Sequence, residues 1–548
     1  MEYLHGVSTM KSSRTKILDL SLITLLLLSI SCSRADNGSI STTVRFLSED
    51  CSNSSLPHNS YIPSNIVKFE IKLYKNEVPT QQQTVQYGGN QSYVEIDDIE
   101  PYDKYKLIIR AFTKDNDIWS GYAEDIPIKP KSKTFVQINL SKEKSLTCTD
   151  TMHNARFLHS SVLLENGNVL VFGGATLAER DYDIYHLKTT EMAEIYYHYK
   201  IEQAEKIDLN VIAGTFSTLS SKMISGRIGY TYEILPDGKI LIAGGVNKID
   251  FIKNPSDFLF CLPEDVQFVY DVEIFDPTKN TFSVIAKLNI PRAFAQSAII
   301  GNKIYIIGGI NSSFDCNNVA ESGINSSISI IDISNLNSPK VEEKDMPDAG
   351  FFAFSKLKLS DNKYIFYGGN KDYALLLNSD ESLKKLDIEV SSDFEGTIPQ
   401  KQYFPNSFSI KTGSTYLNTS GYYKDISPSY FINVSSNDKV TISRDNTSIE
   451  KSFGSAYASK NGYFIQLGGI NSIPIIADDS IIIIKSKLNN YELIDNNSTK
   501  LKRERAFASS VFLDDFTLLT TGGVYFDTLN DAVILNISEI YNLNGILK

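Results

Sequence analysis

The chain has 548 residues, of which 42% are hydrophobic and 22% charged, and its formal net charge is −12. This length is too great for one hydrophobic core of ordinary size, so we expect several domains or one large repeat array. No stretch concentrates Lys and Arg beyond the short Lys500–Arg505, which itself contains a Glu. A nucleic-acid surface needs a basic patch, so we expect no nucleic-acid partner.

The N-terminus has the order of a secretory signal. A basic segment over residues 11–16 precedes the apolar run 20–30, and small residues and a cysteine follow. This order is typical of an export signal, and the apolar run is too short to span a bilayer. We therefore predict a signal peptide over residues 1–31, with either Met1 or Met10 as its start.

The end of this signal, Leu28–Cys32, resembles the bacterial lipobox, although Ser29 stands where that family usually has Leu. The resemblance implies that Cys32 carries palmitate-like acyl chains and begins the mature protein, anchored in the bacterial cell envelope at the outer membrane, on its periplasmic side or at the surface. The alternative is ordinary cleavage near residues 33–35, which would give a soluble product. The polar residues 32–41 are typical of a tether.

Short alternating segments follow the tether. Period-two patterning is clear in Val67–Leu73 and in Phe135–Leu140, with Pro, Gly, Asn and Asp clusters between such segments. This spacing predicts a small β-sandwich over residues 42–143. The stretch Pro101–Ala111 is similar to the late strand of immunoglobulin-like or transthyretin-like modules, and that resemblance implies a spacer or stalk.

From residue 148 onward the chain repeats itself, which decides the expected fold. Each copy reads as a strand, a tight polar turn, a second strand and a glycine pair. The clearest copies are Arg156–Gly174, Arg227–Gly245 and Arg292–Gly309, and later copies end at Gly369, Gly469 and Gly523. A degenerate copy, Phe408–Gly421, lies in the one interval of about double length.

A further strand pair follows each glycine pair, most clearly in Val272–Ile285. Together these features resemble the kelch repeat, which has an Arg before strand a, Gly-Gly after strand b, and an aromatic residue with Asp-Pro on strand c. Phe282 stands where that family has a Trp on strand d. The resemblance covers about 400 residues and implies an all-β, seven-bladed kelch-type β-propeller, over residues 144–548.

Closure of this array can be predicted independently. The last copy ends with an expected strand c at Ser538–Tyr541, and too few residues follow for a strand d. An unpaired strand is expected just before the first copy, at Lys144–Met152. We therefore expect the N-terminal segment to complete the last blade and to leave no open sheet edge.

The long insertions follow the glycine pairs of the first three copies, at 175–188, 246–268 and 310–327. In a propeller these b–c loops share one face with the d–a connections, where four arginines open strand a: Arg156, Arg227, Arg292 and Arg505. We identify these arginines as candidate ligand-binding groups for carboxylates or phosphates. The alternative is that they bond backbone carbonyls of neighbouring blades.

If Cys32 carries lipid, four cysteines remain, an even number suited to disulfides in an oxidising compartment. Four cysteines allow three pairings. The positions of Cys261 and Cys316 in adjacent insertions favour one bond between them, and Cys51 with Cys148 would tie the first domain to the closing strand. Their spacing matches no zinc motif, and we expect no metal site.

Enzymatic signatures are weak. None of the six histidines lies after residue 198, and no nucleophile elbow or P-loop is visible. We assign no catalytic residue and no cofactor. The expected function is a membrane-anchored, monomeric binding protein that recognises a protein or a glycan through the insertion face. The alternative is a periplasmic carbohydrate-active enzyme of the sugar epimerase or mutarotase type.

Overall fold

The computed structural model consists of β-strands and connecting turns, with no α-helix in the part of the chain that it describes. It describes residues 36–51, 63, 65–87, 94–181, 184–203, 212–252, 260–313, 323–348, 350–392, 403–409, 415–423, 425–426, 429–445, 453–472, 476–487, 490–496, 498–526 and 531–547. The predicted signal peptide, Cys32 and Cys316 lie outside these residues. Within them, no helix has the length and apolarity needed to cross a bilayer.

An N-terminal sheet precedes the repeats. Its strands alternate as their sequence predicts, because Phe69, Ile71 and Leu73 of β2 are buried while the residues between them are not. Strand β1 begins at Gly38, so the last four residues of the expected tether belong to the sheet. The strands run in the order β3 (Val78–Gln86), β2 (Ile66–Lys75), β5 (Lys104–Thr113), β6 (Ile118–Pro127), β7 (Lys133–Lys142), β1 (Gly38–Phe46) and β4 (Val94–Ile99).

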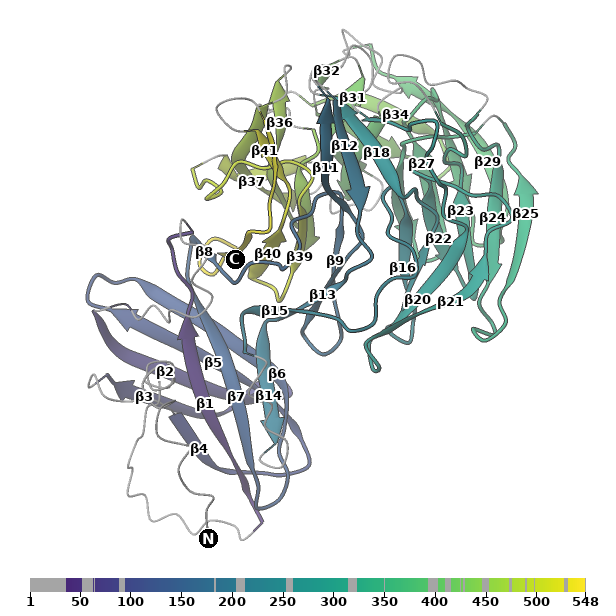
Figure 1. Cartoon of the computed structure of the whole chain (residues 1–548). Coiled ribbons are helices and arrows are strands. Elements are labelled where there is room, and N and C mark those ends of the chain that lie inside the picture. Colours follow the sequence, from purple (N-terminus) through teal and green to yellow (C-terminus); the bar gives the residue numbers. More distant parts are fainter. Residues whose placement is uncertain are drawn as a thin grey trace.

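The repeats form successive sheets of four antiparallel strands, arranged in a propeller-like fold (Figure 1). The first sheet contains β9 (Ser160–Leu163), β10 (Val169–Phe172), β13 (Glu194–Tyr197) and β15 (Thr215–Thr218). The second contains β16 (Thr231–Ile234), β17 (Ile240–Ala243), β20 (Asp271–Asp276) and β21 (Thr281–Lys287). The third contains β22 (Gln296–Ile300), β23 (Lys303–Ile307), β24 (Ser327–Asp332) and β25 (Lys340–Asp345).

The later sheets follow the same order, and the degenerate copy forms one of them. The fourth contains β26 (Ser355–Ser360), β27 (Lys363–Tyr367), β28 (Tyr373–Leu377) and β29 (Leu383–Val390). A parallel pairing of β29 with β34 joins it to the fifth, β30 (Tyr403–Ser409), β31 (Thr415–Tyr423), β33 (Tyr430–Val434) and β34 (Val440–Arg444), with β32 (Asp425–Ile426) on β31. The sixth contains β35 (Ala456–Lys460), β36 (Tyr463–Ser472), β37 (Ile476–Lys487) and β38 (Asn490–Asn496).

The last repeat sheet contains β39 (Ser509–Phe512), β40 (Thr517–Thr521), β43 (Ser538–Asn542) and β8 (Ser145–Cys148). Its outer strand therefore comes from the segment before the first copy, as the missing strand d predicts. Apolar clusters also join consecutive sheets. Leu170 packs with Ile240 between the first and second, and Val169 packs with Leu519 between the first and the last. The strand pairing and the packing thus connect the end of the array to its beginning.

The glycine pairs allow neighbouring sheets to approach closely. Gly174 has φ +83°, and a Cβ placed there would lie 2.6 Å from the carbonyl oxygen of Phe157. Its amide donates to the carbonyl of Arg227 in the next sheet, at 3.1 Å. A side chain at Gly174 would therefore be strained and would collide with its own repeat. A Cβ at Gly244 would lie 2.3 Å from the carbonyl oxygen of Arg292 in the next repeat, so both positions of the pair require glycine.

The N-terminal sheet is fastened to the repeats rather than held on a stalk, which corrects one expectation from the sequence. β14 (Tyr199–Gln203), from the c–d connection of the first repeat, pairs with β7, so the expected boundary at residue 143 is crossed by the sheet. Tyr122 donates from its hydroxyl to the carbonyl of Leu513 at 2.8 Å, and Asn542 donates to Ser141 at 3.0 Å. These contacts fix the two parts to each other.

A histidine is buried at this junction, and its burial predicts that the folded protein loses stability in acid. His198 is 4% exposed, packs between the rings of Tyr122 and Tyr199, and neither ring nitrogen has a hydrogen-bond partner. Burial lowers the pKa of His198 to about 3, whereas an unfolded histidine titrates near ~6.5. The unfolded chain therefore binds the proton first as the pH falls, and the free energy of unfolding decreases through this window by up to about 1.4 kcal/mol per pH unit.

We expect His198→Phe, which retains a ring but cannot take up a proton, to lose less stability than the parent when the pH falls. Urea unfolding of both proteins at neutral and at mildly acid pH measures their free energies of unfolding. The difference between variant and parent should shift in favour of the variant as the pH falls. Parallel stability curves would mean that His198 takes up a proton equally readily in the folded and unfolded chains.

Candidate binding surface

The four arginines that open strand a are buried inside the sheets. Arg156, Arg227 and Arg505 are 0% exposed and Arg292 is 1% exposed. Each donates from Nη1 to the carbonyl of the first glycine in the pair of its own repeat, at distances of 2.9 to 3.2 Å. The assignment of these residues as ligand-binding groups is therefore wrong, because their donors are already directed at partners within the fold.

Three of the arginines also form an ion pair with a buried glutamate. Arg156 bonds Glu194 at 2.9 Å, Arg227 pairs with Glu273, and Arg505 pairs with Glu539. Each glutamate lies on the third strand of its sheet and accepts backbone amides as well, as Glu194 does from His153 and Asn154. Burial lowers the pKa of Arg227, and attraction to Glu273 opposes that change.

In the third repeat the carboxylate that pairs with the arginine comes from a different strand. Ser329 occupies the strand position of the glutamates, and the carboxylate comes instead from Glu343 on the paired outer strand. Arg292 bonds Glu343 at 2.7 Å and Ser329 at 2.8 Å. The sequence carries a signal for the other three partners, a Glu-Ile-aromatic triplet that recurs at residues 194, 273 and 539. This triplet, which was not among the expected site residues, is the local pattern that could have identified the three glutamates.

The insertions build a separate sheet that we call the platform. It contains β11 (Ala175–Asp181), β12 (Ile184–Thr189), β18 (Lys248–Ile252) and β19 (Phe260–Cys261). β12 of the first insertion pairs with β18 of the second, so two loops far apart in sequence become one sheet. Figure 1 places the platform strands β11, β12 and β18 at the end of the molecule opposite the N-terminal sheet.

The underside of the platform is apolar. Phe260 is 1% exposed and lies 5.4 Å from Phe507, and Phe251 stacks on Phe526 at 5.9 Å. Phe526 belongs to a hairpin of the last repeat, β41 (Val524–Phe526) with β42 (Ala532–Ile534). The platform is therefore anchored by aromatic packing over the inner ends of the repeat sheets, so the apolar insertion residue Phe260 is not a free contact patch.

A groove of about 1220 Å³ lies between the platform and the outer parts of the first and second sheets. Four lysines and five acidic residues line it, so its charge is mixed: Lys188, Lys222, Lys248, Lys287, Glu179, Glu191, Asp250, Asp265 and Asp271. Two large apolar side chains stand exposed in it, Ile224 at 54% and Tyr270 at 46%.

Fixed polar groups organise this groove. His186 Nδ1 lies 2.8 Å from Asp250 Oδ1 across the β12–β18 pair, and Lys248 forms an ion pair with Asp265. Asn247 donates to Gln267 at 3.3 Å beside them. These contacts fix the orientation of hydrogen-bond donors and acceptors in the groove, and neither positive nor negative charge dominates. Such a groove suits a ligand with hydroxyl and amide groups better than a polyanion.

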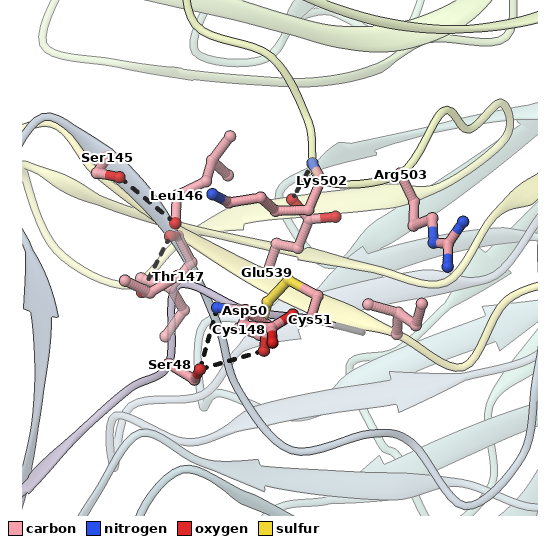
Figure 2. Close-up of a disulfide and its surroundings, with 12 residues drawn as sticks. Ser48, Asp50, Cys51, Ser145, Leu146, Thr147, Cys148, Lys502, Arg503 and Glu539 are labelled. Atoms are coloured by element: carbon pink, nitrogen blue, oxygen red, sulfur yellow. Dashed lines mark hydrogen bonds between the residues drawn. A yellow bond between two sulfur atoms is a disulfide. The ribbon is translucent and has the colours of Figure 1, made fainter. Parts of the chain in front are cut away.

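The predicted bond between Cys51 and Cys148 is present, and Figure 2 shows it beside Glu539 of β43. Their Cα atoms lie 5.6 Å apart. Cys261 is also disulfide-bonded, and its expected partner Cys316 is outside the described residues. Within the described part of the chain, no group of three or more His, Cys, Asp or Glu side chains is placed to hold a metal ion.

Comparison with known proteins gives no assignment. No family model matches the chain, and no curated protein matches it. A solved structure titled "Structure of YjhT" matches with a TM-score of 0.36 and 12% identity, covering 71% of this chain and 95% of that chain. A likeness at this level assigns neither a family nor an activity.

Proposed function

We propose that the protein is an exported, lipid-anchored binding protein, built on a seven-bladed kelch-type β-propeller that follows a small β-sandwich. We infer that it recognises its partner through the groove beside the platform. The single observation that carries this proposal is the groove itself, which is large, preorganised and mixed in charge. Long insertions on a rigid scaffold are where binding function concentrates.

The position of the groove supports this function. The platform and the N-terminal sheet lie at opposite ends of the molecule. If Cys32 carries lipid, the N-terminal sheet lies toward the membrane, and the groove faces away from it. We favour a glycan as partner, because exposed Tyr270 offers a flat apolar face beside donors and acceptors that match sugar hydroxyls.

The test compares two double variants of the chain from Ser33 onward. Ile224→Ser with Tyr270→Ser removes the apolar surface of the groove, and Val78→Ser with Tyr102→Ser removes exposed apolar surface from the N-terminal sheet. On a glycan array we expect the groove variant to bind at least about tenfold more weakly, and the control variant to bind like the parent.

Equal binding by both variants would overturn the groove as the site. If no glycan binds, pull-downs with cell-surface proteins use the same pair of variants. Capture lost only in the groove variant would then identify a protein partner at this site, and capture unaffected by either variant would contradict the proposal.

A carbohydrate-active enzyme of the epimerase or mutarotase type is the second candidate, and one observation favours it. The His186–Asp250 contact at 2.8 Å is the arrangement in which a carboxylate orients a general base. If a bound sugar is turned over, His186→Asn would abolish turnover while binding persists. Turnover unchanged in that variant would exclude this residue pair as the catalytic one.

A further inference from the structure

A ring of unusual backbone conformations surrounds the centre of the repeat array. Six residues at equivalent positions, just before the inner strands, have positive φ: Leu158 (54°), Gly229 (64°), Phe294 (55°), Ala353 (52°), Gly454 (68°) and Phe507 (53°). Only two are glycines. For a bulky residue this conformation is strained, and such strain persists only where the surrounding structure imposes it.

Hydrogen bonds between sheets hold these residues in place. The amide of Leu158 donates to the carbonyl of Phe507 at 3.0 Å, and the amide of Phe507 donates to Gly454 at 2.6 Å. On the other side, Phe294 donates to Gly229 at 2.7 Å. The inner ends of neighbouring sheets are therefore bonded to one another, and they enclose a fixed space between them.

That space is a chamber of about 350 Å³, and all six residues of the ring line it. Its size is within the range of small-molecule sites, roughly 300–1,000 Å³. One end lies under the platform, where Phe260 contacts Phe507 at 5.4 Å and Phe453 contacts Phe507 at 5.6 Å. Aromatic side chains dominate the walls.

The few polar groups of the chamber are neutral. No Asp, Glu, Lys or Arg is among its described lining residues. His159 lines it, is 7% exposed, and has a buried Nδ1 with no hydrogen-bond partner. Burial lowers the pKa of His159 far below its usual value, so the ring is uncharged at neutral pH. The hydroxyls of Tyr232 and Tyr457 have no hydrogen-bond partner among the described residues, and Tyr457 is 45% exposed.

We propose that this chamber binds an uncharged small molecule with a mainly apolar ring and one or two hydroxyl or amide groups. The aromatic walls take the ring, and Tyr232, Tyr457 and His159 take its polar groups. A charged ligand is disfavoured because the chamber offers no counter-charge for an ion removed from water. This site is separate from the groove, because the two share no lining residue.

The experiment uses isothermal calorimetry with a matched set of ring compounds. 4-Hydroxybenzamide is the neutral probe, and 4-hydroxybenzoate and tyramine are its anionic and cationic counterparts. Glucose is a neutral probe without an apolar ring. We expect 4-hydroxybenzamide to bind in the millimolar range or tighter, and the other three to bind at least about tenfold more weakly.

Variants separate this chamber from other sites. Ala508→Phe fills the chamber from the half-buried Ala508 on its wall and should abolish binding. Tyr232→Phe with Tyr457→Phe removes only two hydroxyls and should weaken binding about tenfold without changing the melting temperature. Tyr270→Ser, in the groove, should bind the probe like the parent. No binding of the neutral probe, equal binding of the charged probes, or binding retained in a folded Ala508→Phe would overturn the proposal.

Discussion

Arg227→Met should lower the free energy of unfolding by about 3–5 kcal/mol. The substitution leaves Glu273, which is 0% exposed, without its cation. It also removes the donor to the carbonyl of Gly244, which has a bond of 3.1 Å in the parent. An uncompensated buried charge accounts for most of the loss.

Arg503→Met is the matched control, because Arg503 is exposed two residues before the buried Arg505 of another repeat. Surface substitutions of this kind usually change stability by less than about 0.5 kcal/mol. The double variant Arg227→Met with Glu273→Met should lose less than the sum of the single variants, since no charge remains unpaired. Urea denaturation compares the free energy of unfolding of four variants with that of the parent: Arg227→Met, Glu273→Met, the double variant and Arg503→Met. A free energy of unfolding equal to that of the parent would contradict this structural role of Arg227.

Loss of the Cys51–Cys148 disulfide should cost about 2–5 kcal/mol. The bond joins residues 97 apart, and a cross-link over so long a loop restricts the unfolded chain strongly. Its position adds a local reason. Strand β8 has only four residues, and Cys148 faces Glu539 of β43 in the register, so the bond holds the strand that completes the last sheet.

The measurement is thermal unfolding of Cys51→Ser with Cys148→Ser, both in one chain, under oxidising conditions. Comparing variants rather than adding reductant matters, because Cys261 is also disulfide-bonded. Removing both cysteines together leaves neither Cys51 nor Cys148 as an unpaired thiol that could form a wrong bond. A melting temperature equal to that of the parent would mean that the pairing of β8 with β43 and the contacts of the N-terminal sheet suffice to hold the closing strand.

For the four arginines, the sequence and the tertiary structure provide different information. Their regular spacing before strand a is visible in the sequence, and so is their place on the insertion face. The spacing does not show where the arginine side chains point, because that depends on glutamates that lie 34 to 51 residues later in the chain. In the third repeat the carboxylate even comes from a different strand, Glu343 on β25. No local pattern around Arg292 carries that information.

The platform likewise shows which part of the candidate site the sequence predicts. The insertions are recognisable in the sequence because they lengthen the connections between the strands of otherwise regular repeats. Their pairing through β12 and β18, with Leu187 opposite Ile249, joins segments about 60 residues apart in the chain. The groove depends on this pairing, and so does the end of the chamber that Phe260 closes. Of the three insertions expected on one face, the first and second form the platform, and a hairpin of the last repeat joins them. In the described parts of the third insertion, Ile310 belongs to the same apolar cluster as these segments, and Ile324 packs against it.

The sequence by itself determined what depends on local repetition: β-strands of period two, glycine pairs where sheets approach, an outer strand of the last sheet supplied from before the first copy, and a cysteine within that strand. These are properties of residues near one another in the chain, or of one pattern copied several times. The tertiary structure alone decided that the arginines are buried and that β14 crosses into the N-terminal sheet. It also decided that the insertions border a groove, and that the inner ends of the repeat sheets enclose a neutral chamber. Each of these is set by packing between segments distant in sequence, where the partner of a charged or apolar side chain is fixed only when the sheets come together.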